Sequence, residues 1–277
     1  MSSRMVRVPE ESVTRLVTWR TAMMGLVMQQ RERFGSTGRV GTRLSRRQWL
    51  HCSLAGLVAA CAPGTSVLAQ GTSEPASTKP APAPRQPVIL VVGDSLSAEY
   101  GIARGQGWVA LLEQRLRRDG LRAAVVNASV SGDTTAGGQA RLPALLSRHR
   151  PAVVVIELGG NDALRGLPMS ATRQNLRDMA RAARAAGARV LIAGMQLPPN
   201  YGKAYAQEFV AVFAEVAQAE AAALVPFLLK NVADGPDADQ MFQPDRIHPT
   251  AQAHQRILDN IWPALKPLVL AASRAGR

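Results

Sequence analysis

The chain contains very little cysteine, few aromatic side chains and no long apolar run. Its only cysteines, Cys52 and Cys61, both lie near the amino end, so later residues can form neither a disulfide framework nor a cysteine metal site. Aromatic residues make up 4% of the chain, too few for a groove that stacks single-stranded nucleic acid. The apolar run from Leu54 to Ala60 is too short to span a bilayer.

Positive charge is abundant, with a formal net charge of +13, but it is unevenly placed. Residues 1–69 carry +7 of it and residues 70–277 the remaining +6. The later arginines cluster in predicted helices, which favours solvated helix faces over a phosphate-binding stripe. Examples are Arg115, Arg117, Arg118, Arg173, Arg177, Arg181 and Arg184. We therefore expect no nucleic-acid partner.

The amino end has the order of an export signal. Arg46-Arg47 precede the short apolar run, and small residues follow as far as Val67-Leu68-Ala69. Positive, then apolar, then small residues are typical of a secretory signal, and the paired arginines resemble a twin-arginine signal. We predict that residues 1–69 are an amino-terminal extension and signal peptide, and that the protein is periplasmic or secreted.

Two processing outcomes are compatible with this segment. Cleavage after Ala69 would release a soluble protein, which is the outcome that we favour. Val58-Ala59-Ala60-Cys61 also resembles a weak lipobox, which would leave a lipid anchor at Cys61. Residues 70–86 are rich in proline, alanine, serine and threonine and are predicted to be an extended linker.

From Pro87 onward, short apolar runs alternate with segments of helical period. Leu176, Met179, Ala180 and Ala183, for example, repeat at helical spacing. Apolar strands that alternate with helices indicate a parallel sheet covered on both faces. Strands are predicted at 88–92, 123–127, 153–158, 190–193 and 224–225. We predict one α/β domain over residues 87–272, a three-layer α/β/α flavodoxin-like fold with a five-stranded parallel sheet.

Ligands of open α/β sheets bind beyond the carboxyl ends of the strands, so the residues that follow each strand are the first candidates. Gly93-Asp94-Ser95-Leu96-Ser97 follows the first strand. Position 97 is serine, so this is not the G-x-S-x-G turn, and an α/β-hydrolase is disfavoured. The Ser95 hydroxyl fits either a nucleophile or a helix N-cap.

The next two loops contain groups that could stabilise negative charge. Gly132 follows the second strand, and Gly160-Asn161 follow the third. A glycine lets its backbone N–H approach a substrate closely, and an asparagine side chain is also an N–H donor. Acyl transfer needs such donors, because charge develops on the carbonyl oxygen. Each loop taken alone also fits ordinary turn chemistry.

A base candidate stands near the carboxyl end, where Asp245 precedes His248 by three residues. Histidine can take a proton from a serine at neutral pH, and the carboxylate can reach its other ring nitrogen. A metal-binding pair is the alternative, but no further ligand of suitable spacing accompanies it, so we expect no metal or cofactor. His149 and His254 fall inside helical patterns and are expected at the surface or in packing.

Taken together, these segments resemble the four sequence blocks of the SGNH (GDSL) hydrolase superfamily, in order. The likeness covers roughly residues 88–268 and extends to the bacterial acyl-CoA thioesterase I, lysophospholipase L1 and arylesterase family. It implies that Ser95 is the nucleophile, His248 the base and Asp245 its orienting partner. It further implies an oxyanion hole formed by the Ser95 and Gly132 N–H groups and the Asn161 side chain. The expected substrate-binding residues are Asp94, Leu96, Gly160, Pro198, Asn200 and Tyr201.

The resulting expectation is an exported serine esterase or thioesterase that acts through an acyl-enzyme on Ser95. Its substrates would be small molecules such as aryl esters, acyl thioesters or lysophospholipids. Two alternatives remain open on the same fold. One is an O-deacetylase of carbohydrates or cell-wall polymers, and the other is a non-catalytic binding module.

Overall fold

In a computed structural model of the chain, residues 86–275 are described, and they form an α/β fold. Five parallel strands make one sheet in the order β2-β1-β3-β4-β5. The strands are β1 (Val88–Gly93), β2 (Ala124–Asn127), β3 (Val153–Glu157), β4 (Arg189–Ala193) and β5 (Ala223–Val225). This is the flavodoxin-like strand order, so the predicted fold class and all five predicted strands are confirmed.

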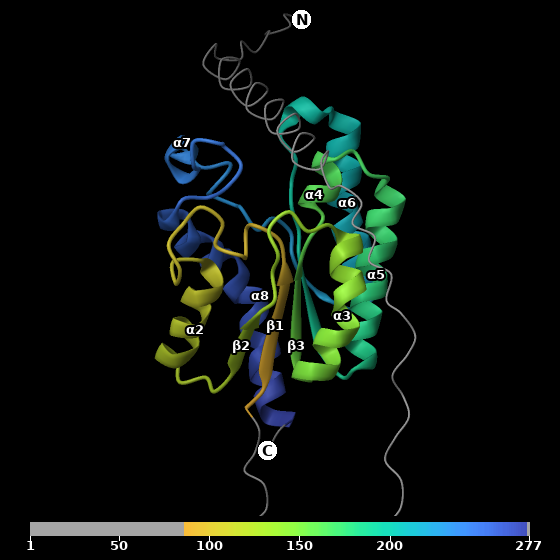
Figure 1. The fold of residues 1–277 in the computed structure, drawn as a ribbon, viewed down its shortest axis with the longest axis vertical. Helices are drawn as coiled ribbons and strands as arrows, with labels where there is room; N and C mark the ends of the chain where they lie inside the picture. Colours follow the sequence, from red (N-terminus) through yellow and green to blue (C-terminus); the bar gives the residue numbers. More distant parts are fainter. Residues whose placement is uncertain (1–85, 276–277) are drawn as a thin grey trace, which may run out of the picture. The chain divides into compact units, whose positions relative to one another are not determined.

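Helices cover both faces of the sheet (Figure 1). On one face lie α2 (Trp108–Arg118) and α8 (His254–Ala275), and on the other α3 (Thr135–His149), α5 (Met169–Ala185) and α6 (Lys203–Ala219). The short helices are α4 (Gly160–Leu164), α7 (Ala238–Met241) and the 3₁₀ helices η1 (Pro199–Tyr201) and η2 (Ala251–Ala253). Between residues 86 and 275, no helix has the length and apolar character needed to cross a membrane.

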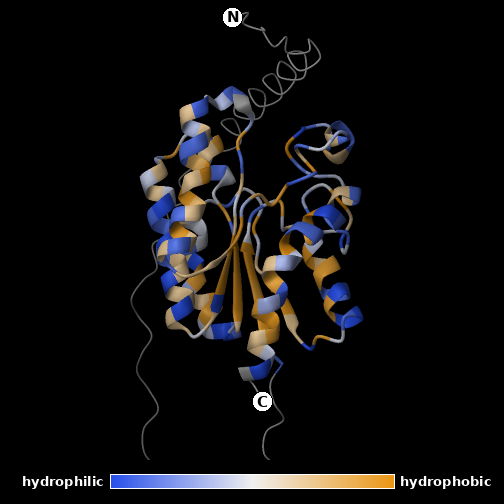
Figure 2. Cartoon of the chain, turned by 180° about the vertical axis from the view of Figure 1, so that it is seen from behind, coloured by the Kyte–Doolittle hydropathy of each residue, from blue (hydrophilic) through white to orange (hydrophobic). Residues whose placement is uncertain are grey.

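The sheet forms the centre of the core, as the apolar strands in Figure 2 show. Every residue of β3 is buried, and so are five of the six residues of β1. Helix α5 packs its predicted apolar stripe against the sheet, because Leu176, Met179, Ala180 and Ala183 are all fully buried. Two-sided burial explains why the strands are continuous apolar runs.

The arginines of α5 have a more specific role than a solvated helix face. Glu220, just after α6, is buried, and Arg181 donates to its carboxylate at 2.9 Å. Arg177 and Arg184 lie within 4.0 Å of the same carboxylate. A buried carboxylate needs such partners. These arginines therefore join α5 to the end of α6 while remaining partly exposed.

The predicted signal peptide (1–69), most of the predicted linker (70–86) and Cys61 lie outside the described residues.

The amino end of α2 is held by a residue from the start of α8. The backbone N–H of Trp108 donates to Nδ1 of His254 at 3.1 Å, and His254 is 2% exposed. An accepting ring nitrogen carries no proton, so the imidazole is neutral. Burial lowers the pKa of His254 to about 4, although the charge of Glu99 acts in the opposite direction.

This buried histidine predicts a loss of stability in mild acid. The unfolded chain binds a proton at His254 near pH 6.5, whereas the folded chain resists it until about pH 4. The free energy of unfolding should therefore fall as the pH drops through this window, by about 3 kcal/mol in total. Urea unfolding of wild type and His254→Gln between pH 7 and 4 measures the effect. The glutamine variant should show a flatter profile, and identical slopes would contradict the assignment.

Candidate active site

The candidate site lies at the carboxyl edge of the sheet, where β1 and β3 are neighbours. Strand order reverses at this point, which is where doubly wound folds bind ligands. Gly93 at the end of β1 is in register with Glu157 at the end of β3. The loop after β2 joins them, because the N–H of Val130 donates to the carbonyl of Gly93 at 3.0 Å. Loops distant in sequence are thereby brought to one edge.

Ser95 lies in a series of tight turns directly after β1 rather than at a helix start. The next helix, α2, begins only at Trp108, so the N-cap interpretation of Ser95 is wrong. The Ser95 hydroxyl lies 2.9 Å from Nε2 of His248. Nδ1 of His248 lies 2.7 Å from the Asp245 carboxylate. The structure thus joins these three residues in one hydrogen-bonded chain.

The Asp245 carboxylate is held in place by the backbone of the residues that follow it. Its second carboxylate oxygen accepts the N–H groups of Ile247 at 2.9 Å and His248 at 3.0 Å. Burial alone would raise the pKa of Asp245, but the hydrogen bonds from His248 and Ile247 outweigh it and lower that pKa below its usual value. A charged Asp245 accepts the Nδ1 proton, which leaves Nε2 free to accept from the Ser95 hydroxyl.

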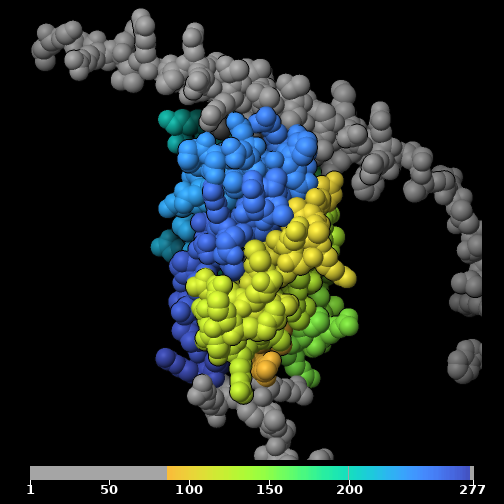
Figure 3. Space-filling view, turned by 90° about the vertical axis from the view of Figure 1, so that its left-hand side faces the viewer, coloured from red at the N-terminus to blue at the C-terminus, as the bar shows by residue number. Residues whose placement is uncertain are grey.

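The loop that carries His248 is fixed against the loop after β1. Residues Phe242 and Pro249 form an antiparallel bridge, and Gln243 donates to the carbonyls of Tyr100 and Pro249, each at 2.9 Å. The ring of Tyr100 lies 4.3 Å from that of His248, centroid to centroid. Figure 3 shows the two segments side by side, in yellow and blue. No pattern in the sequence predicts this contact of Tyr100.

Three N–H donors are available near Ser95. Within residues 86–275, the backbone N–H groups of Ser95 and Gly132 have no hydrogen-bond partner. Gly132 has φ +78°, a conformation that glycine adopts at little cost. The Arg165 guanidinium donates a hydrogen bond to the Gly132 carbonyl at 2.7 Å. The Asn161 amide donates one N–H to Asp94 at 3.0 Å, and its nitrogen carries a second.

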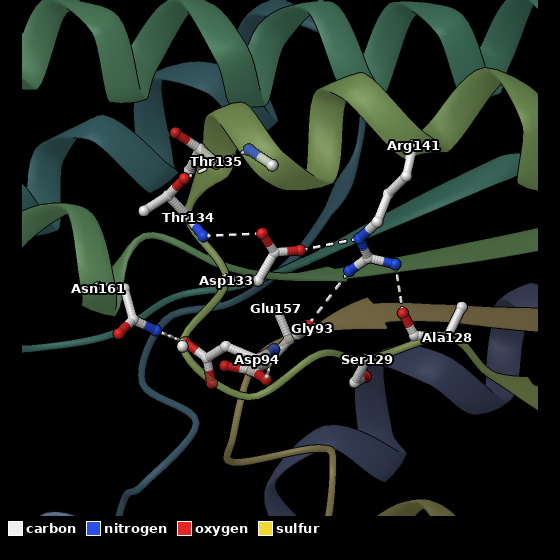
Figure 4. A network of polar contacts seen from close by, with 12 residues as sticks. Gly93, Asp94, Ala128, Ser129, Asp133, Thr134, Thr135, Arg141, Glu157 and Asn161 are labelled. Atoms are coloured by element: carbon white, nitrogen blue, oxygen red, sulfur yellow. Dashed lines mark hydrogen bonds and ion pairs between the residues drawn. The ribbon is translucent and has the colours of Figure 1, made fainter. Parts of the chain in front are cut away.

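Two buried carboxyl groups, those of Asp94 and Glu157, lie close to one another at this edge of the sheet (Figure 4). Asp94 accepts the Leu96 N–H at 3.0 Å besides the Asn161 amide. Burial raises the pKa of Asp94 to about 7 even though both hydrogen bonds lower it. Glu157 is fully buried, and burial together with the charge of Asp94 raises its pKa well above the usual value. Glu157 was not predicted as a site residue, because its only signal in the sequence is that it ends an apolar run.

The predicted substrate-binding residues fall into two groups. Asp94, Leu96 and Gly160 are buried, so the Asp94 carboxylate contacts protein groups. Asn200 is exposed and Tyr201 half-buried, beside the start of α6. That helix is joined to α4 because the hydroxyl of Tyr205 donates to Ala163 at 3.2 Å. Between residues 86 and 275, no hydrogen bond joins Pro198, Asn200 or Tyr201 to Ser95 or His248.

Metal ligands are scarce in the same region. Within the described part of the chain, no three His, Cys, Asp or Glu side chains are placed together as metal ligands. Both ring nitrogens of His248 are already engaged by Ser95 and Asp245.

Sequence comparison identifies relatives with known activities. A model of the GDSL-like lipase/acylhydrolase family matches residues 91–256. Esterase TesA of Pseudomonas aeruginosa is 56% identical over 65% of this chain and 89% of its own length. A protein of Escherichia coli named thioesterase 1/protease 1/lysophospholipase L1 is 42% identical over 65% of this chain and 84% of its own. An arylesterase of Vibrio mimicus is 40% identical over 62% of this chain and 84% of its own.

Solved structures of esterases are also similar to this chain. The crystal structure of TesA matches with a TM-score of 0.63 and 56% identity, covering 65% of this chain and 99% of that one. The psychrotrophic esterase EstA from Pseudoalteromonas sp., inhibited by monoethylphosphonate, matches with a TM-score of 0.61 and 35% identity. It covers 65% of this chain and 97% of that one.

Proposed function

Because the chain belongs to the GDSL-like lipase/acylhydrolase family, and is therefore an SGNH-type hydrolase, we propose that it cleaves carboxylic esters and thioesters through an acyl-enzyme on Ser95. The observation that carries this proposal is the placement of the His248 imidazole, 2.9 Å from the Ser95 hydroxyl and 2.7 Å from the Asp245 carboxylate. A serine of ordinary pKa is a weak nucleophile, and such a pair is the arrangement that activates it.

The reaction would proceed in two halves. Ser95 Oγ attacks the acyl carbon while Nε2 of His248 takes the hydroxyl proton, and Asp245 stabilises the resulting imidazolium. The tetrahedral oxyanion is met by the N–H groups of Ser95, Gly132 and Asn161. Collapse breaks the bond to the alcohol or thiol, which leaves with the proton from His248. Water then attacks the acyl-enzyme by the same route and releases the acid.

The surroundings of Ser95 favour substrates with apolar groups. Four large apolar side chains are exposed within residues 86–275, and three of them lie in the segments that follow β1, β2 and α4. These three are Tyr100, Val130 and Leu167. Apolar side chains near a reactive serine suit an acyl chain or an aryl ring. We therefore propose aryl esters, acyl thioesters and lysophospholipids as the substrate classes, in line with the names of the relatives.

Covalent labelling and a substrate profile test the proposal together. A phosphonate ester should inactivate the enzyme with one adduct per chain, and peptide mass spectrometry should place it on Ser95. Medium-chain 4-nitrophenyl esters and acyl-CoA should be hydrolysed faster than acetylated xylan. An active enzyme that prefers acetylated xylan would instead be a deacetylase. A chain that neither reacts nor hydrolyses any of these compounds would be a binding module.

We also propose that the protein is exported by the twin-arginine route, on the basis of Arg46-Arg47 before the short apolar run. A domain without cysteine gains nothing from oxidative folding, so folding before export carries no penalty. Replacing both arginines with lysine keeps the charge, so a general secretory signal would still work, whereas twin-arginine export should stop. Cell fractionation with an activity assay measures the result. Undiminished periplasmic activity of the lysine variant would contradict the proposal.

Processing at the amino end is part of the same proposal. Cleavage after Ala69 predicts a mature chain that begins at Gln70 and stays in the soluble fraction. A lipid anchor would instead leave a membrane-bound chain that begins at Cys61. The intact mass of the mature protein distinguishes the two.

A further inference from the structure

Glu157 is a buried carboxyl group that the proposed reaction does not use, and it lies directly under the loop of Ser95. One of its oxygens, Oε2, accepts the Asp94 backbone N–H at 3.3 Å and the Ser97 hydroxyl at 2.6 Å. These two donors stand on either side of Ser95 in the sequence. Glu157 therefore holds the nucleophile loop at two points.

The packing around Gly93 shows how closely the carboxyl group approaches this loop. A Cβ atom on Gly93 would lie 2.7 Å from Oε2 of Glu157 and 2.8 Å from Oγ of Ser97. The backbone of Gly93 does not have a positive φ, so conformation alone does not require glycine there. The carboxyl and hydroxyl groups occupy the space that any side chain at position 93 would fill.

Ser97 extends the same attachment to two other elements. Its hydroxyl accepts the indole N–H of Trp108 at 3.2 Å, so its own proton is directed to Glu157. Its carbonyl accepts the Asn127 amide at 2.7 Å. Ser97 is 1% exposed, so water does not compete for the bonds of its hydroxyl. The loop of Ser95 is thus fixed to β3, to α2 and to the end of β2.

The charges around Glu157 favour its uncharged form. Asp94 is its acidic neighbour, and Asp133 and Asp162 add negative charge close to Asp94. The nearby cation, Arg141, pairs with Asp133 at 2.8 Å rather than with Glu157 (Figure 4). Oε1 of Glu157 has no hydrogen-bond partner among the described residues, a costly position for a charged oxygen.

Asp94 is the better placed of the two to be charged, because the N–H groups of Leu96 and Asn161 stabilise its carboxylate. We propose that Glu157 is a positioning residue that acts in its uncharged form, fixing the loop on both sides of Ser95 and leaving the negative charge on Asp94 beside Asn161. This inference depends on the proposed role of Ser95 as nucleophile.

Three variants test the proposal, with kcat and KM measured on a 4-nitrophenyl ester. Glu157→Gln keeps an uncharged acceptor, so its kcat should stay within about threefold of wild type from pH 6 to 8. Glu157→Leu removes the acceptor and should lower kcat about 10- to 100-fold with KM little changed, because a small displacement of the nucleophile is costly. Ser97→Ala removes one of the two bonds and should lower kcat about tenfold. The exposed Glu113→Gln is the matched control.

The results distinguish a charged from an uncharged Glu157 and test its positioning role. A glutamine variant as impaired as the leucine variant would show that the carboxylate charge is needed, which overturns the uncharged form. If Glu157→Leu and Ser97→Ala keep the wild-type kcat, the positioning role is overturned while the proposed function stands. If Glu157→Leu does not fold, Ser97→Ala and Glu157→Gln still decide. Failure of the function itself is recognised separately, because the wild type would then neither hydrolyse the ester nor be labelled by a phosphonate at Ser95.

Discussion

Replacement of Ser95 with alanine is expected to lower kcat for 4-nitrophenyl ester hydrolysis by about a millionfold, the loss typical of a removed serine nucleophile. No neighbouring hydroxyl can take over, because Ser97 is buried and bonded to both Glu157 and Trp108. The fold should survive, since among residues 86–275 the Ser95 hydroxyl forms a hydrogen bond with His248 alone. Steady-state kinetics and thermal unfolding measure the two effects.

A matched control for this variant is Ser170→Ala, at an exposed position in α5, which should retain wild-type turnover. If Ser95→Ala kept a readily measurable share of the wild-type kcat, a different nucleophile or direct attack by water would have to replace the proposed reaction. Phosphonate labelling of the variant would then locate the group that reacts.

Replacement of Asn161 with alanine should lower kcat by about 10²- to 10³-fold while KM changes little, because an oxyanion donor acts mainly in the transition state. The amide is held in place by its hydrogen bond to Asp94, so its second N–H needs no reorganisation when charge develops. Initial rates over a range of ester concentrations separate kcat from KM.

Asn260→Ala is the matched control for this second variant. Its amide bonds to the carbonyls of Leu228 and Lys230 and to neither Ser95 nor His248, so its loss should lower stability without lowering kcat. A raised KM at unchanged kcat in Asn161→Ala would instead assign that amide to ground-state substrate binding. The oxyanion assignment would then be wrong.

Much of the fold was predictable because the central strands β1, β3 and β4 are buried on both faces. Val153–Ile156 form an unbroken apolar run for this reason, and the helix stripe of Leu176 and Met179 has the period of one buried face. The loop after β1 was less predictable. A helix was expected close to Ser95, but turns continue to Gly107, because contacts with residues far along the chain hold them. Gln243, for example, donates to the carbonyl of Tyr100 at 2.9 Å.

The candidate site was predictable only where its chemistry is local in sequence. Asp245 and His248 are three residues apart, so their contact follows from spacing alone. The network of Glu157 depends instead on which strands are neighbours, and its loop partners are 60 and 63 residues away. The ring contact between Tyr100 and His248 likewise needs two loops to meet. No periodic pattern in the sequence predicts either contact.

The separation of 153 residues between Ser95 and His248 also orders events during synthesis. A chain grows from its amino end, so β1 and its serine leave the ribosome long before the histidine does. Within the described residues, the loop of His248 is followed by η2 and by α8, which packs against α2 and against β3, β4 and β5. A nascent or truncated chain that ends before Phe242 contains the nucleophile without its base. Esterase activity should therefore appear only once nearly the whole domain has been made.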